Sequence, residues 1–194
     1  NKKNFNSSNH LLNLNKFFNI GIKELNYSLS NLSEKYKLEA KRLLPDKNYV
    51  GFSLTQGNEY RKKNWSLKNF ITLASKISLE NKVPVFFVES NQIDLINKIK
   101  SELPKALFPE MHSNISCPAL VTALASRLNL AISIDNGVMH MMSLADIPMI
   151  VLFGPTSSDK FAPKIKKIKV LDSKKIYKSK DVDTITVHDV YKLI

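Results

Sequence analysis

The sequence has few of the residues that mark an extracellular, metal-centred or membrane-spanning protein. Cys117 is the only cysteine among 194 residues, which excludes an internal disulfide and a cysteine-built metal site and is consistent with a reducing compartment. No apolar run approaches the ~20 residues that a helix needs to cross a bilayer. Residues 1–10, NKKNFNSSNH, lack the apolar core of a secretory signal and do not begin with Met. We therefore expect a cytoplasmic chain that is a fragment of a longer protein.

Acidic residues are also scarce, since 17 Asp and Glu stand against 29 Lys and Arg and leave a net charge of +12. Such a charge attracts an anionic membrane surface, a phosphorylated substrate or nucleic acid. It also arises from a general bias toward Lys and Asn, which this sequence shows. Nucleic acid is the weakest of these interpretations, because the lysines lack interleaved exposed aromatic residues. Peripheral contact with an anionic inner membrane stays open.

What the chain does contain is a regular alternation of apolar runs and amphipathic segments. The pattern predicts strands at 49–55, 83–89, 130–135, 147–154 and 165–172, a short strand at 105–108, and helices at 32–46, from 66, at 92–103, 117–129, 137–146 and 186–194. Continuous apolar strands between helices indicate a Rossmann-like α/β fold, with a parallel sheet covered by helices on both faces. We expect residues 1–46 to form an arm with one helix, and residues 47–194 to form the domain.

Polar residues follow two of these strands at the points where they end. Asp135, Asn136 and Gly137 come directly after LAISI, and His140 lies one helical turn later. Ligands of open parallel sheets bind beyond the carboxyl ends of the strands, where helix N-termini attract anions. Each residue alone is better explained as a helix cap or a packed surface side chain than as part of a ligand site.

Two more loops are expected at the same sheet edge. VLFGPTSSD ends a strand at Gly154 and offers the Thr156 hydroxyl, while Pro155 stiffens the backbone. The loop after the first strand, TQGNEYRKKNW, brings Lys63 beside Trp65. Together these loops predict an anion site.

These motifs resemble those of the lipopolysaccharide heptosyltransferases, glycosyltransferase family 9. The family's D-[TS]-G-x-x-H turn corresponds to 135–140, its F-G-P-T to 153–156, and its K-R-W-P to 63–66, in order over residues 48–194. The resemblance implies the C-terminal, donor-binding half of a two-domain GT-B enzyme. Such enzymes transfer a sugar with inversion from a nucleotide-sugar such as ADP-heptose to a lipid-linked lipopolysaccharide core, and no metal or other cofactor is expected.

The resemblance also assigns donor-binding roles by position. Lys63 and the turn from Asp135 through Asn136 and Gly137 to His140 would hold the diphosphate, with Thr156 on the neighbouring loop. Thr55 and Gln56 would line the first loop. Ribose and adenine would lie near 89–92, including Gln92, and near 116–118. The catalytic base is unknown and would belong to the missing N-terminal domain.

Three positions depart from the family pattern: Asn136 replaces Thr or Ser, Asn64 replaces Arg, and Ser66 replaces Pro. An isolated nucleotide-binding module without transferase activity therefore remains the alternative.

Overall fold

The computed structural model describes residues 29–45, 48–55 and 63–194. These residues form one five-stranded sheet in the order β2-β1-β3-β4-β5, with every pair parallel. The strands are β1 Tyr49–Ser53, β2 Val83–Phe87, β3 Leu130–Ile134, β4 Met149–Phe153 and β5 Ile168–Asp172. The predicted Rossmann-like fold is confirmed.

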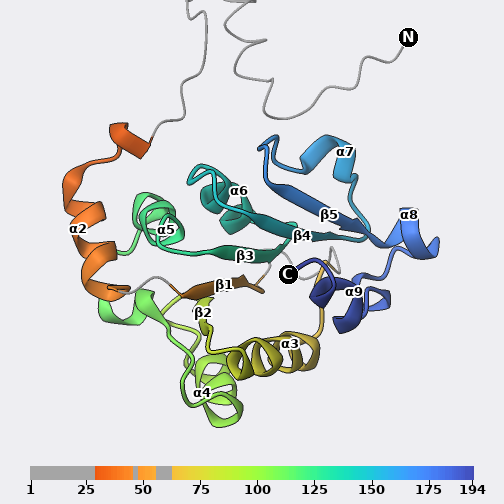
Figure 1. The fold of residues 1–194 in the computed structure, drawn as a ribbon, viewed down its shortest axis with the longest axis horizontal. Coiled ribbons are helices and arrows are strands. Elements are labelled where there is room, and N and C mark those ends of the chain that lie inside the picture. The colour runs from red at the N-terminus through yellow and green to blue at the C-terminus, as the bar shows by residue number, and fades with distance from the viewer. Residues whose placement is uncertain (1–28, 46–47, 56–62) are drawn as a thin grey trace, which may run out of the picture.

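Helices cover both faces of this sheet (Figure 1). One face packs on α3 Leu67–Leu79, α4 Ile93–Glu102 and α9 Val187–Tyr191. The other packs on α2 Glu34–Leu43, α5 Pro118–Ala125 and α6 Gly137–Ser143. Neighbouring residues along a strand face opposite sides, so Val50 and Phe52 join the first core while Tyr49 joins the second. The described residues also form short helices: α7 Ser158–Phe161, α8 Ser173–Tyr177, and the 3₁₀ turns η2 Leu29–Asn31, η4 Pro109–His112 and η5 Val182–Thr184.

Two side chains anchor the start of α3. Ser66 caps the helix by accepting from the Asn69 N–H at 3.4 Å. Trp65, only 2% exposed, donates its indole N–H to the Ile185 carbonyl at 2.7 Å. The segment that carries Lys63 is therefore tied, immediately before α3, to the core and to the turn that precedes α9.

The prediction of a strand at 105–108 is wrong. Only Leu107 pairs with the sheet, through an isolated bridge to Val85. Ala106 instead donates its N–H to the Leu103 carbonyl, and Pro109, which has no N–H, begins η4.

The helix predicted at 32–46 is present as α2, although Ser33 makes no side-chain capping bond. Ala40 and Leu44 are buried against α5, so α2 packs on the domain (Figure 1). Residues 46–47, where we placed the domain boundary, lie outside the described residues, and that boundary stays a prediction. In the part of the chain that the structure describes, no helix is long and apolar enough to span a membrane.

Candidate functional site

The strand order predicts a ligand crevice at the carboxyl ends of β1 and β3. The chain leaves β1 toward β2 on one side, then returns to form β3 on the other side. Connections that diverge from two neighbouring strands leave a gap between them, which is where open α/β sheets bind ligands. Thr55 follows β1 and Asp135 follows β3, so both lie at this point.

Asp135 is the centre of the candidate site. Its carboxylate is buried, with a side-chain exposure of 6%. Oδ2 accepts from Lys63 Nζ at 2.5 Å and from Thr156 Oγ1 at 2.6 Å. Three loops that are far apart in sequence therefore meet on one carboxylate oxygen. A nearly buried ion pair with a further hydroxyl bond fixes the Lys63 ammonium at the sheet edge.

Asn136 holds the turn together from inside. Its Oδ1 caps α6 by accepting from the Met139 N–H at 2.8 Å. Its Nδ2 donates to Ser53 Oγ at 2.7 Å and to the Thr55 carbonyl at 2.8 Å. Both amide hydrogens are used within the chain, so this side chain bridges the crevice between β1 and β3. The donor that we expected Asn136 to offer a ligand is already engaged.

Gly137, the first residue of α6, stands beside open space. A Cβ built on this residue would meet nothing within 4 Å. The first N–H groups of a helix have no intrahelical acceptor, and those of Gly137 and Val138 belong to this turn. The protein's own packing does not require a glycine here, whereas a ligand that approaches the backbone would.

His140 is an exposed residue one turn along α6. Atoms packed around part of its imidazole lower its pKa below the ordinary 6.5; the Asp135 carboxylate opposes this shift and the Lys63 charge adds to it. The ring therefore senses both members of the ion pair. It is neutral at pH 7 and can donate one N–H.

The loop after β4 is held by contacts that sequence reasoning missed. Lys174 Nζ donates to the Thr156 carbonyl, and Asp172 Oδ2 accepts from Ser158 Oγ at 2.6 Å. Asp172 is the last residue of β5, and Asp135 directly follows β3, so the position of Asp172 at a strand end was a usable signal. Lys174 carried no such signal, because it lies on the short helix α8. These bonds fix Thr156 in the position from which it donates to Asp135.

Gln92 lies apart from this cluster. It is the N-cap residue of α4, beyond the carboxyl end of β2, and its backbone N–H donates to the Glu89 carbonyl. β2 and β3 flank β1 on opposite sides. Gln92, which follows β2, and Asp135, which follows β3, are therefore separated by the end of β1. Gln56, predicted for the same loop as Thr55, lies outside the described residues.

A second polar group, on the β2 side, was only partly anticipated. Ser116 Oγ donates to Glu110 Oε2 at 3.0 Å. Burial raises the pKa of Glu110, the Ser116 bond opposes that shift, and the charge of Glu89 adds to it. Glu89 and Ser116 were expected near the ribose, whereas Glu110 was not identified because it lies in the short turn η4.

No group of three or more His, Cys, Asp or Glu side chains that could hold a metal occurs among residues 29–45, 48–55 and 63–194. The expectation that catalysis needs no metal stays a prediction.

The five-stranded parallel sheet defines the class: a Rossmann-like α/β domain whose fold matches about half of the chain in GT-B heptosyltransferase structures. The chain belongs to glycosyltransferase family 9, the heptosyltransferase family, whose sequence profile matches residues 9–192. No curated protein matches the sequence significantly.

Solved structures agree on the fold. A family 9 glycosyl transferase from Veillonella parvula superposes with a TM-score of 0.78 at 19% identity, covering 100% of this chain and 60% of that one. The E. coli ADP-heptose lipopolysaccharide heptosyltransferase II superposes with a TM-score of 0.66 at 18% identity, covering 84% of this chain and 51% of that one. E. coli heptosyltransferase WaaC, solved with ADP, superposes with a TM-score of 0.64 at 14% identity, covering 79% of this chain and 47% of that one. The chain thus spans about half the length of these enzymes.

Proposed function

We propose that this chain is the donor-binding half of an inverting glycosyltransferase. The donor would be a nucleotide-diphosphate sugar such as ADP-heptose, and the acceptor a lipid-linked saccharide of the lipopolysaccharide-core type. One observation carries the proposal: Lys63, Asp135 and Thr156 converge beside the open start of α6 at the crevice. One structural neighbour, E. coli WaaC, was solved both with ADP and with ADP-2-deoxy-2-fluoro heptose, which supports this donor class.

The proposed chemistry is stabilisation of the leaving diphosphate. When the bond from the sugar to the phosphate breaks, negative charge grows on the departing oxygen. Preorganised donors lower the energy of that charge more than mobile water does. Asp135 holds Lys63 in place for this task, and the His140 imidazole and the first N–H groups of α6 add donors. Since α6 has only seven residues, Lys63 supplies the main charge.

The nucleoside would lie on the other side of the crevice. Gln92 and Glu89 follow β2, and Ser116 precedes α5 beside Glu110. Carboxylates accept from hydroxyl groups, so Glu89 and Glu110 suit the two ribose hydroxyls. Thr55 would lie between the nucleoside and the phosphates, because Asn136 fixes its carbonyl across the gap.

Calorimetry with ADP and with adenosine tests this assignment. Lys63→Met and His140→Ala should each weaken ADP binding about ten- to a hundredfold, since a hydrogen bond to a charged group contributes ~1.5–3 kcal/mol. Adenosine binding should change little in either variant, because it has no phosphate. Lys68→Met is the matched control: it removes the same charge from an exposed position on α3.

The proposal fails if Lys63→Met and Lys68→Met weaken ADP binding equally, because the phosphates then respond only to net charge. Loss of adenosine and ADP affinity together would indicate a folding defect, since Lys63→Met removes the ion partner of buried Asp135. His140→Ala separates these cases, because His140 is exposed.

A further inference from the structure

The loop after β4 is held by the end of the neighbouring strand, β5. Asp172, the last residue of β5, is 3% exposed, and its Oδ2 accepts from Ser158 Oγ at 2.6 Å. Its Oδ1 accepts from the Lys174 backbone N–H at 3.0 Å, at the start of α8. The Lys174 side chain then reaches back to the loop, where its Nζ donates to the Pro155 and Thr156 carbonyls. One buried carboxylate therefore fixes both the loop and the lysine that binds it.

The hydroxyl of Thr156 has a single proton, and the protein already uses it. An ionised carboxylate only accepts hydrogen bonds, so the 2.6 Å contact from Thr156 Oγ1 to Asp135 Oδ2 takes that proton. The hydroxyl can then offer a ligand only its lone pairs, which phosphate oxygens also carry. Thr156 is therefore suited to hold Asp135 rather than to donate to a phosphate.

Asp135 in turn determines where the Lys63 ammonium lies. A lysine has a flexible four-carbon stem, so the position of its ammonium follows its acceptor. Asp135 Oδ2 accepts from Lys63 as well as from Thr156, and the side chains of Lys63 and Asp135 are only 12% and 6% exposed. Removal of the Thr156 hydroxyl would release the carboxylate from the β4 loop, so that the carboxylate and its lysine could turn together.

We propose that Lys174 and Thr156 are positioning residues for the diphosphate of the donor. Lys174 fixes the loop that carries Thr156. Thr156 fixes Asp135, which fixes Lys63, and neither Lys174 nor Thr156 contacts the phosphates. This role rests on the proposed donor-binding function and adds that donor affinity depends on a network that extends past β4 to the end of β5. The competing role is a direct bond from the Lys174 ammonium to a phosphate.

A double-mutant cycle separates positioning from direct contact. Lys174→Met and Thr156→Val should each weaken ADP binding about tenfold, because either change releases the ion pair from the loop. The double variant should also bind about tenfold more weakly than the unaltered protein, whereas losses from independent contacts would multiply to about a hundredfold. Adenosine, which has no phosphate, should bind all three variants as it binds the unaltered protein. Thr156→Ser keeps the hydroxyl and should retain ADP affinity.

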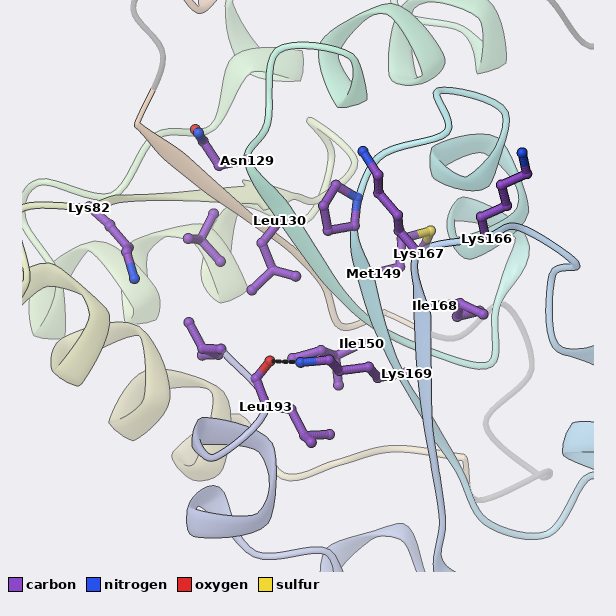
Figure 2. Close-up of a pocket in the computed structure, with 13 residues that line it drawn as sticks. Lys82, Asn129, Leu130, Met149, Ile150, Lys166, Lys167, Ile168, Lys169 and Leu193 are labelled. Atoms are coloured by element: carbon purple, nitrogen blue, oxygen red, sulfur yellow. Dashed lines mark hydrogen bonds between the residues drawn. The ribbon is translucent and has the colours of Figure 1, made fainter.

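Lys169 supplies a matched control near the other end of β5. It lines a cavity where the strands begin, and its Nζ donates to the Leu193 carbonyl at 2.7 Å (Figure 2). Lys169→Met therefore removes the same charge and the same kind of bond as Lys174→Met, but away from the carboxyl ends of the strands. Lys175→Met, the neighbouring change on α8, removes a charge that pairs with exposed Asp159. ADP affinity should change less than about twofold in both controls, because exposed charges are screened.

The protein without ligand gives a second readout. The His140 imidazole senses both members of the ion pair. Thr156→Val and Lys174→Met should therefore shift the ¹H and ¹³C resonances of the His140 ring in NMR spectra recorded without ADP. His112 lies in η4, which contacts β2 at the opposite edge of the sheet, so its ring resonances should not move. Lys169→Met should shift neither ring.

Two results would overturn the proposal. Additive losses of ADP affinity in the cycle would show that Lys174 binds the phosphates itself. Unshifted His140 resonances in both single variants would show that the ion pair does not depend on Thr156. The outcome also separates this proposal from the donor-binding function. If the unaltered protein binds no ADP while His140 shifts in both variants, the donor-binding function fails and the network is supported.

Discussion

Two glycines at the ends of neighbouring strands have different physical reasons to be glycine. A Cβ on Gly154 would lie 2.4 Å from Val182 Cγ2 and 2.6 Å from the Lys180 carbonyl oxygen. Packing therefore excludes a side chain at Gly154. A Cβ on Gly137 would contact nothing, and the residue is exposed. Space left open at the start of α6 is consistent with a ligand that approaches the backbone.

Gly137→Ala should therefore separate binding from folding. Alanine suits a helix better than glycine, by roughly 0.5–1 kcal/mol, so the melting temperature should stay the same or rise. ADP affinity should fall at least about tenfold, because the methyl group would occupy the proposed phosphate position. Thermal unfolding and calorimetry on the same sample measure both effects.

Gly154→Ala is the opposite control and should lower the melting temperature, since its Cβ would overlap backbone and Val182. Unchanged ADP affinity in Gly137→Ala would show that the phosphates bind elsewhere.

The residue pattern identified the side chains of the strand-end cluster. It did not identify all of the residues that hold them in place. Asp135, Lys63 and Thr156 were each identified, and the structure brings them together. Lys174, which fixes Thr156, could not be found, because its contact depends on how α8 folds back after β5. The ligand-binding roles themselves stay predictions.

At the scale of elements, long periodic segments were predictable and short ones were not. All five strands and helices α2 to α6 follow from apolar patterning, whereas the five-residue helix α9 was predicted together with its cap, Thr186. Helices α7 and α8 have four and five residues, too few to show a helical period. The order of the strands in the sheet could not be predicted from the sequence either, because an apolar run does not specify which strand it pairs with.

Helix α2 is tied to the domain by a polar contact that depends on pH. Arg42 donates two bonds of 2.8 Å to the Glu39 carboxylate and one of 2.7 Å to the His112 carbonyl. Ser113 also donates to Glu39, at 2.8 Å. The Arg42 bond, then the Ser113 bond, lower the pKa of Glu39 from 4.5 to about 2.

Because the folded pKa lies below the unfolded value, this contact stabilises the protein fully above about pH 4.5 and is lost as the pH falls toward 2. Glu39→Gln should lower the melting temperature by a few degrees at neutral pH, a modest effect because Arg42 is 58% exposed. The difference from the unaltered protein should shrink as acid is added.

Glu34→Gln is the control, since Glu34 pairs with Lys37 at 3.4 Å on the exposed side of α2. A melting-temperature difference for Glu39→Gln that stays constant from pH 7 to about 2 would contradict the assignment.

At the scale of the whole molecule, the described cluster contains donors but no assigned base. Asp135 is the strand-end carboxylate nearest the proposed phosphates, and its Oδ2 already accepts from Lys63 and Thr156. Sugar transfer needs a base within hydrogen-bond reach of an acceptor hydroxyl, and an acceptor held at attack distance. Since the chain spans about half of its structural relatives, we propose that both requirements are met by a facing domain.

The isolated chain should therefore bind a nucleotide-heptose and yet transfer no sugar at a useful rate. The measurement is incubation of the 194-residue chain with ADP-heptose and a truncated lipopolysaccharide core, with product detected by mass spectrometry. The basic surface could still recruit the phosphorylated acceptor, but recruitment does not align a hydroxyl with the sugar's anomeric carbon. ADP-heptose binding measured on the same sample distinguishes a missing base from a misfolded chain. Efficient transfer without added metal would refute the half-site proposal, and Asp135 would then be the first carboxylate to test as the base.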